Sequence, residues 1–296
     1  MAATDGESTH RSSTGSSPGT GTTGSAHDDG QVYFGLERVS PAEKTRRVSD
    51  VFAAVARRYD VMNDIMSAGL HRPMKQLAID LAGVRRGSVV LDLAGGTGDL
   101  TARFAERVGS EGSVVLADLN IDMISEGRRR LDDRGMTGVR YVQVNAEALP
   151  FPDHHFDVAS IAFGLRNVAR KDVALREMLR VLKPGGRVLV LEFSRPRSKL
   201  VREGYRVWQS LWPGIGKAIT GDAGPYRYLV DSITTHPDQE TLATMLGDAG
   251  FVGVRCHDLM NGIVALHIGV APPAAATSPA AATSPAAATS PAATTR

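Results

Sequence analysis

Short apolar runs alternate with helix-like segments through the middle of this chain of 296 residues. A short, continuously apolar run is typical of a strand that is buried on both faces of a sheet. Strands that alternate with helices favour a parallel sheet with helices on both faces. We therefore predict an α/β fold with strands at 88–93, 114–117, 139–144, 156–162 and 187–193, and helices at 99–108, 121–132 and 173–182.

The segments on either side of this region follow different patterns. Apolar residues before it recur at helical spacing, and a proline followed by acidic residues marks a helix start near its far end. Asn261-Gly262 separates the last two strand-like runs, and an Asn-Gly pair at that place is typical of a hairpin. We therefore predict helices at 41–66, 73–82 and 237–249, and an antiparallel pair of strands at 252–259 and 263–269.

Both ends of the chain lack the apolar residues that a folded core requires. Residues 1–30 are mostly small and polar, and from residue 273 the chain repeats PAAATS, where a proline in each repeat prevents a continuous helix. Neither end can bury enough apolar surface to offset the entropy that ordering would cost. We expect a disordered extension at 1–40, one domain at 41–271 that contains an insertion at 195–235, and a disordered tail at 272–296.

Composition excludes several classes of protein. The single cysteine, Cys256, cannot form an internal disulfide, and it is expected to be a small buried residue. No run approaches the roughly 18 apolar residues of a membrane span, and the N-terminus has no apolar segment typical of a secretory signal. The net charge of +2 gives no indication of nucleic-acid binding, and His154-His155 lack further ligands at metal spacing. We therefore expect a cytoplasmic protein with no metal and no nucleic-acid partner.

The segment 91–99, LDLAGGTGD, predicts a ligand site where a strand passes through a glycine-rich turn into a helix. Gly95, Gly96 and Gly98 allow the backbone to turn sharply and to approach a ligand closely. The next strand ends in Asp118, twenty residues after Gly98, where a carboxylate can accept hydrogen bonds from both hydroxyls of a ribose.

Two classes of cofactor share this pattern, and two residues distinguish them. A dinucleotide site would have Gly or Ala at position 101, where this chain has Thr101. Asp92, inside the strand, suits a ligand that carries an ammonium group, as S-adenosylmethionine does. An antiparallel last strand is also the usual signature of the Rossmann-like fold of class I S-adenosylmethionine-dependent methyltransferases. We favour that fold class and cofactor, and an NAD-dependent oxidoreductase or a non-catalytic cofactor-binding protein stays open as an alternative.

At this level of detail the sequence resembles the ubiquinone/menaquinone biosynthesis C-methyltransferase family, of the demethylmenaquinone methyltransferase type. The resemblance runs from about residue 51 to residue 269. Its most restrictive parts are YDVMN at 59–63 and FGLRN at 163–167. The other parts are LDLAGGTGDLTARF (91–104), VLADLNIDM (115–123), NAEALPFPD (145–153), VLKPGGRVLVLEFSRP (181–196), YRYLVDSI (226–233), HPDQETL (236–242) and NGIVALHIG (261–269).

The resemblance implies an S-adenosylmethionine cofactor and a particular reaction. The cofactor would be contacted by Thr97, Asp118, Asn145 and Ala146, beside Asp92 and the glycines of the turn. The reaction would be C-methylation of demethylmenaquinol to menaquinol, and the benzoquinol precursor of ubiquinone is the alternative substrate. Arg166 and Asn167 follow the fourth strand at the carboxyl edge of the sheet, so we expect Arg166 to stabilise a developing phenolate and Asn167 to orient a quinol oxygen. Tyr59 is expected to cover cofactor and substrate. A salt bridge to a loop carboxylate is the alternative role of Arg166, and packing in the core is an equal alternative for Tyr59.

A polyprenylated quinol lies in a bilayer, so the resemblance also implies a transient contact with the inner face of the cell membrane. Trp208, Leu211, Trp212 and Ile215 recur at helical spacing in the insertion, among basic residues. This pattern suits an interfacial surface or a lid, and an internal packing stripe is an equal alternative. Pro213 is expected to break the run after one or two turns. A homodimer stays open.

Overall fold

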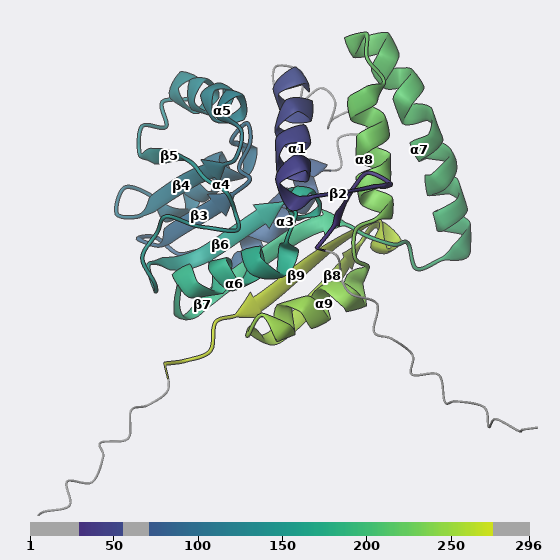
Figure 1. Cartoon of the computed structure of the whole chain (residues 1–296). Helices are drawn as coiled ribbons and strands as arrows, with labels where there is room; N and C mark the ends of the chain where they lie inside the picture. Colours follow the sequence, from purple (N-terminus) through teal and green to yellow (C-terminus); the bar gives the residue numbers. More distant parts are fainter. Residues whose placement is uncertain (1–29, 56–70, 275–296) are drawn as a thin grey trace, which may run out of the picture. The chain divides into compact units, whose positions relative to one another are not determined.

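The computed structural model describes residues 30–55 and 71–274 of the chain, and its centre is a seven-stranded sheet (Figure 1). The strand order is β5-β4-β3-β6-β7-β9-β8. The first five strands in that order run parallel, and β9 lies antiparallel between β7 and β8. The strands are β3 (Val89–Leu93), β4 (Ser113–Asp118), β5 (Val139–Gln143), β6 (Phe156–Ala162), β7 (Leu182–Phe193), β8 (Val252–Leu259) and β9 (Val264–Val270).

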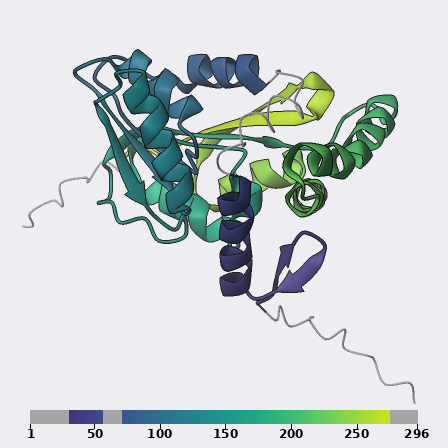
Figure 2. The same ribbon diagram turned by 90° about the horizontal axis from the view of Figure 1, so that it is seen from above.

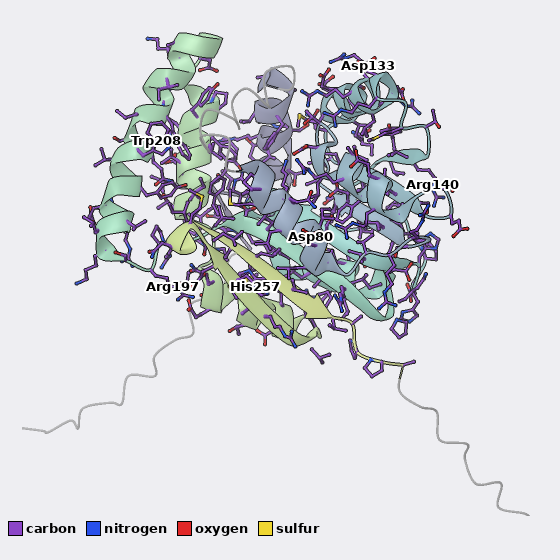
Figure 3. The ribbon with its side chains drawn as sticks, turned by 180° about the vertical axis from the view of Figure 1, so that it is seen from behind. Asp80, Asp133, Arg140, Arg197, Trp208 and His257 are labelled. Atoms are coloured by element: carbon purple, nitrogen blue, oxygen red, sulfur yellow. The ribbon has the colours of Figure 1, made fainter. Side chains whose placement is uncertain are left out.

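Helices cover both faces of the sheet, as alternation of apolar strands and amphipathic helices requires. Successive residues of one strand point to opposite faces, so Val90 packs in one buried cluster and Leu91 in another. The helices α3 (His71–Ala82) and α4 (Asp99–Val108) cover the first face together with α5 (Ile121–Asp133), and α3 carries Asp80 in Figure 3. The helices α6 (Lys171–Val181) and α9 (Gln239–Asp248) cover the second face, in front of the sheet in Figure 1.

The predicted α/β fold class and its antiparallel last pair are confirmed, with small differences at element ends. Of the helix predicted at 41–66, α1 (Pro41–Val55) is described, and the remainder lies outside the described residues. The helix predicted from residue 237 begins at Gln239, because the Asp238 side chain accepts a hydrogen bond from the Thr241 N–H and so occupies the N-cap. Cys256 is exposed on the edge strand β8, so the expectation of a buried residue was wrong.

The insertion consists of two helices, α7 (Lys199–Thr220) and α8 (Gly224–Thr234), that pack against each other beside the end of β7. Pro213 lies inside α7, so the prediction that it ends the helix was wrong. Trp212 is 1% exposed and packs with Tyr226 of α8 in one apolar cluster. Packing of this kind offsets the helix hydrogen bond that a proline removes. A Cβ on Gly216 would lie 2.1 Å from the Tyr226 ring, so the two helices approach closely there.

A small hairpin precedes α1, inside the stretch that was expected to be disordered at 1–40. Its strands are β1 (Val32–Phe34) and β2 (Glu37–Val39), paired so that Phe34 is opposite Glu37. The expectation for residues 32–39 was therefore wrong: strands of three residues give no recognisable apolar pattern. The hairpin contacts both α1 and α8, and Figure 2 shows it beside α1.

Candidate functional site

A pocket opens at the carboxyl edge of the parallel strands, where the loops after β3, β4, β5 and β6 meet. It contains about 1080 Å³ of space, part of which is open to solvent. Helix α1 adds Ser49 and Phe52 to its walls, and α3 adds Lys75. The strand order reverses between β3 and β6, and ligands of open α/β sheets bind in the crevice at such a point.

The glycine-rich turn after β3 forms one wall of this pocket. Gly95 and Gly96 line it, and Gly96 has a φ of +55°, which favours glycine. The Gly96 N–H donates to Asp118 Oδ2 at 3.0 Å, and the Asn120 N–H donates to Asp118 Oδ1 at 2.9 Å. A Cβ on Gly127 of α5 would lie 2.7 Å from the Gly96 carbonyl oxygen. The turn is therefore held between the end of β4 and α5, with Asp118 fixed beside it.

Asp92 also lines the pocket and is 1% exposed. Its Oδ2 accepts a hydrogen bond from Thr101 Oγ1 at 2.6 Å, and its Oδ1 accepts one from Ser160 Oγ at 2.8 Å. Burial raises the pKa of Asp92 from 3.8 to about 6, although the two hydroxyl donors act against that shift. Burial also raises the pKa of Asp118. Both carboxylates are therefore costly to keep charged without a ligand, and a cationic or hydroxyl-bearing ligand would stabilise them.

Of the remaining residues predicted to bind the cofactor, some line the pocket and one lies behind its wall. Thr97, Asn145 and Ala146 line the pocket. Asn145 Oδ1 accepts a hydrogen bond from the Glu147 N–H at 3.0 Å, which closes the turn after β5. Gly98 is not among the lining residues: it precedes α4 with a φ of +82°, and supports the turn from behind.

Arg166 lies in the short helix η2 (Leu165–Asn167), directly before Asn167. Its Nη1 is 2.8 Å from Oε1 of Glu192 on β7, and the two side chains are 4% and 1% exposed. The Arg166 N–H donates to Glu192 Oε2 at 3.2 Å, and the guanidinium lies over the Phe193 ring at 5.4 Å. The predicted catalytic arginine is thus one half of a buried ion pair, and it is not among the residues that line the pocket.

The other two predicted catalytic residues differ in what the structure describes. Asn167 lines the pocket, and its Oδ1 accepts a hydrogen bond from the Tyr228 hydroxyl of α8 at 3.0 Å. Tyr59 lies outside the described residues. The structure therefore brings Asn167 to the same pocket as Asp92 and Asp118, and it places Arg166 immediately beside that pocket.

The turns after β3 and β6 touch each other at the pocket. Ala94 and Phe163 both have positive φ values, +53° and +54°, which are uncommon for residues with a side chain. A Cβ on Gly164 would lie 2.5 Å from the Ala94 Cβ, so only glycine allows this approach. Strained backbone of this kind concentrates at functional sites. The FGLRN segment is thereby fixed against the glycine-rich turn.

Helix α1 is attached to the pocket at two points, through Ser49 and through Lys44. Asn120 Nδ2 donates to the Ser49 carbonyl oxygen at 2.9 Å, while its Oδ1 caps α5. Lys44 Nζ donates to the carbonyl oxygens of Arg166 and Val168 at 3.3 and 3.1 Å. Burial lowers the pKa of Lys44 to about 7. Asn120 had a recognisable signal, because it stands at an N-cap position, but nothing in the sequence marks Ser49 or Lys44.

The described part of the chain contains no group of side chains that could hold a metal ion. Among residues 30–55 and 71–274, no three His, Cys, Asp or Glu side chains are grouped as metal ligands would be. His154 Nδ1 is instead 3.0 Å from the Leu182 carbonyl oxygen.

Comparison with known proteins gives the family. Residues 40–271 match the model of the ubiE/COQ5 methyltransferase family. A protein of Azotobacter vinelandii named ubiquinone/menaquinone biosynthesis C-methyltransferase UbiE is 57% identical over 243 residues, which cover 81% of this chain and 96% of that protein. A protein of the same name from Pseudomonas putida is 53% identical over 248 residues, covering 83% and 97%.

Solved structures agree on the fold. An S-adenosylmethionine-dependent methyltransferase from Thermotoga maritima has a TM-score of 0.55 at 18% identity, covering 75% of this chain and 99% of its own. The [4+2]-cyclase SpnF has a TM-score of 0.54 at 16% identity, covering 77% and 96%. A cyclase and a methyltransferase share this architecture, so the fold alone does not determine the reaction. The family match does determine the class: the chain belongs to the ubiE/COQ5 methyltransferase family, whose methyl donor is S-adenosylmethionine.

Proposed function

We propose that this protein transfers a methyl group from S-adenosylmethionine to a ring carbon of demethylmenaquinol. The observation that carries the proposal is that one pocket is lined by both the glycine-rich turn with its two carboxylates and the FGLRN segment. The names of the similar proteins, which refer to quinone C-methylation in two pathways, support the reaction class.

The residues of the pocket suit the two ends of the cofactor. Asp92 would hold its ammonium group, and Asp118 its ribose hydroxyls, while the glycine-rich turn leaves room for the chain between them. Asn145 and the backbone of Ala146 would contact the adenine edge. When bound, S-adenosylmethionine supplies a methyl group on a positively charged sulfur.

The reaction needs alignment and charge stabilisation. The quinol ring carbon becomes nucleophilic as a neighbouring hydroxyl loses its proton to water. As the C–C bond to the methyl group forms, the bond between that methyl and sulfur breaks to leave S-adenosylhomocysteine, and the ring carbon then loses its own hydrogen as a proton to water. Alignment of the two reactants can contribute on the order of 7–11 kcal/mol. The amide of Asn167 would donate to that quinol oxygen from the pocket wall. Arg166 directly precedes Asn167 in η2 and is paired with the buried Glu192, and the positive charge of its guanidinium would stabilise the phenolate from beside the pocket.

A paired assay tests the substrate. The purified protein is incubated with methyl-labelled S-adenosylmethionine and either demethylmenaquinol or the benzoquinol precursor of ubiquinone, each with a short prenyl tail. We expect label in menaquinol at the higher kcat/KM. Label in the benzoquinol product alone would show that demethylmenaquinol is not the substrate and that the protein acts in the ubiquinone pathway. Binding of NAD, with no binding of S-adenosylhomocysteine by calorimetry, would contradict both.

We also propose that α7 contacts the membrane surface from which the quinol is taken. Four of its apolar side chains share one exposed face, and Trp208 marks that helix in Figure 3. Helix α7 also carries basic residues along its length, and such residues would be attracted to anionic lipid headgroups. In the described part of the chain no helix is long and apolar enough to span a bilayer. The four side chains are Leu200, Val207, Trp208 and Leu211, with exposures of 82%, 64%, 36% and 51%.

Vesicle flotation tests this contact. We expect the protein to float with vesicles that contain anionic phospholipid, and the double change Leu200→Ser with Leu211→Ser to reduce the bound fraction severalfold. Leu77→Ser on α3, whose side chain is 38% exposed, is the matched control and should float like the unchanged protein. A different result would contradict this proposal: the protein does not float, and sedimentation shows a dimer that the double change dissociates. The exposed face of α7 would then bind a second copy of the chain.

A further inference from the structure

The amide of Asn167 is held by a residue of the insertion. Tyr228 of α8 donates its hydroxyl hydrogen to Asn167 Oδ1 at 3.0 Å, across 61 positions of sequence. With Oδ1 occupied in this way, the two N–H groups of the amide are left to serve other acceptors. Asn167 lines the pocket, so those groups are available to a ligand oxygen there.

We propose that Tyr228 is a positioning residue for the methyl transfer, and that the N-terminal hairpin holds it in place. Tyr228 fixes the Asn167 amide in the orientation that offers its N–H groups to the quinol oxygen. The proposal rests on the proposed function for the identity of that oxygen, but the Tyr228–Asn167 contact does not depend on the substrate.

The environment of Tyr228 suits a fixed donor. Its side chain is 7% exposed, and burial raises the pKa of its hydroxyl above the usual range, so the group stays protonated. A buried hydroxyl that has a partner is strongly held, because leaving it unpaired would carry the full cost of its desolvation. Tyr226, two residues earlier on α8, is also buried, at 2% exposure, but its hydroxyl has no hydrogen-bond partner among the residues that the structure describes. The two tyrosines therefore differ in the one contact that the proposal needs.

The hairpin is built against the ring of Tyr228. Phe34 of β1 stacks on that ring, with centroids 4.5 Å apart and planes inclined by 22°. Gly35, at the turn of the hairpin, has a φ of +58°, and a Cβ there would lie 3.2 Å from the Asp231 side chain of α8. The turn thus approaches α8 one helical turn after Tyr228.

Helix α1 holds the hairpin from the other side. Arg47 lies over the Phe34 ring at 5.4 Å, and its Nη1 is 2.7 Å from Oε2 of Glu37 on β2. A continuous series of contacts therefore runs from α1 through Phe34 and Tyr228 to Asn167. The hairpin precedes residue 40, where the match to the family model begins, so the family match does not assign it a role.

The experiment compares Tyr228→Phe with Tyr226→Phe in the full chain. For Tyr228→Phe we expect kcat on demethylmenaquinol to fall about 10- to 100-fold, because a small misplacement in an aligned site is costly. The affinity for S-adenosylhomocysteine and the melting temperature should stay near those of the unchanged protein. Tyr226→Phe should leave kcat unchanged. Equal kcat values for the two variants would overturn the proposal.

A double variant tests whether Tyr228 acts through Asn167. Tyr228→Phe should add little to the loss that Asn167→Ala already causes, since both remove the same oriented amide. Full additivity of the two losses would show that Tyr228 acts elsewhere. Phe34→Leu should also lower kcat, by a smaller factor than Tyr228→Phe. An unchanged kcat in Phe34→Leu would show that the hairpin does not hold Tyr228 in place.

An NMR measurement on the protein without substrate tests the Tyr228–Asn167 contact independently of the proposed function. In 15N-labelled protein, the Asn167 side-chain amide signal is identified by its loss in Asn167→Asp. We expect that signal to shift in Tyr228→Phe and to stay in place in Tyr226→Phe. If the unchanged protein methylates neither quinol but the signal shifts as expected, the proposed substrate fails and the positioning contact stands. An unshifted signal overturns the contact itself.

Discussion

Replacing Arg166 with alanine is expected to lower the free energy of unfolding by about 3–5 kcal/mol. The change leaves the Glu192 carboxylate, which is 1% exposed, buried without its charged partner. Urea unfolding followed by circular dichroism measures the loss. Turnover should fall strongly as well, at temperatures where the variant remains folded, because the pair supports the loop that carries Asn167.

Two variants separate the effect of burial from the effect of charge. Arg176→Ala removes an ion pair with Asp172 in which the two side chains are 55% and 58% exposed, and it should cost about 1 kcal/mol or less. Combining Arg166→Met with Glu192→Gln removes both buried charges and should recover much of the lost stability, but not the turnover. An Arg166→Ala loss no larger than that of Arg176→Ala would show that the Glu192 carboxylate is not left buried without compensation.

Asp92→Asn is expected to change stability in a pH-dependent way. The pKa of Asp92 is raised from 3.8 to about 6 by burial, so the folded state favours the neutral acid. This contribution to stability is fully present below pH 4 and is lost as pH rises through about 6. Asparagine does not ionise, so relative to the unchanged protein the ligand-free variant should gain about 2 kcal/mol between pH 4 and pH 8. Urea unfolding at both pH values measures this gain.

The same change, Asp92→Asn, should also weaken binding of the cofactor. The ammonium group of S-adenosylhomocysteine loses a charged acceptor, which is expected to lower affinity about 10- to 100-fold. Calorimetry measures the affinity, and Asp157→Asn, at the start of β6 and away from the pocket, should bind normally. A stability difference that is constant with pH would contradict the assignment of the shift to Asp92. Unchanged affinity would place the ammonium group elsewhere.

The sequence predicted the sheet and the glycine-rich half of the pocket because both depend on local patterns. An apolar run such as that of β3 can only be buried, and Gly96 stands at a turn that favours positive φ. The terminal hairpin was predicted for the same reason: Asn261 adopts a φ of +59° there.

The support of the catalytic half could not be predicted, because its contacts join distant segments. Glu192 lies 26 residues from Arg166 in sequence, and no spacing rule connects them. Pro213 was predicted to end a helix on local grounds, and the packing of Trp212 on α8 decided otherwise. The strands of the N-terminal hairpin are too short to show a period, so their role depends on a contact with Tyr228 that only the fold creates.

The position of β9 has a consequence for synthesis. This strand is the last element of the sheet to leave the ribosome, yet it lies between β7 and β8 rather than at an edge. Until residues 264–270 are available, β7 presents an open backbone edge that can pair with other chains. A nascent chain stopped before residue 264 should therefore stay aggregation-prone even though its cofactor-binding half is complete.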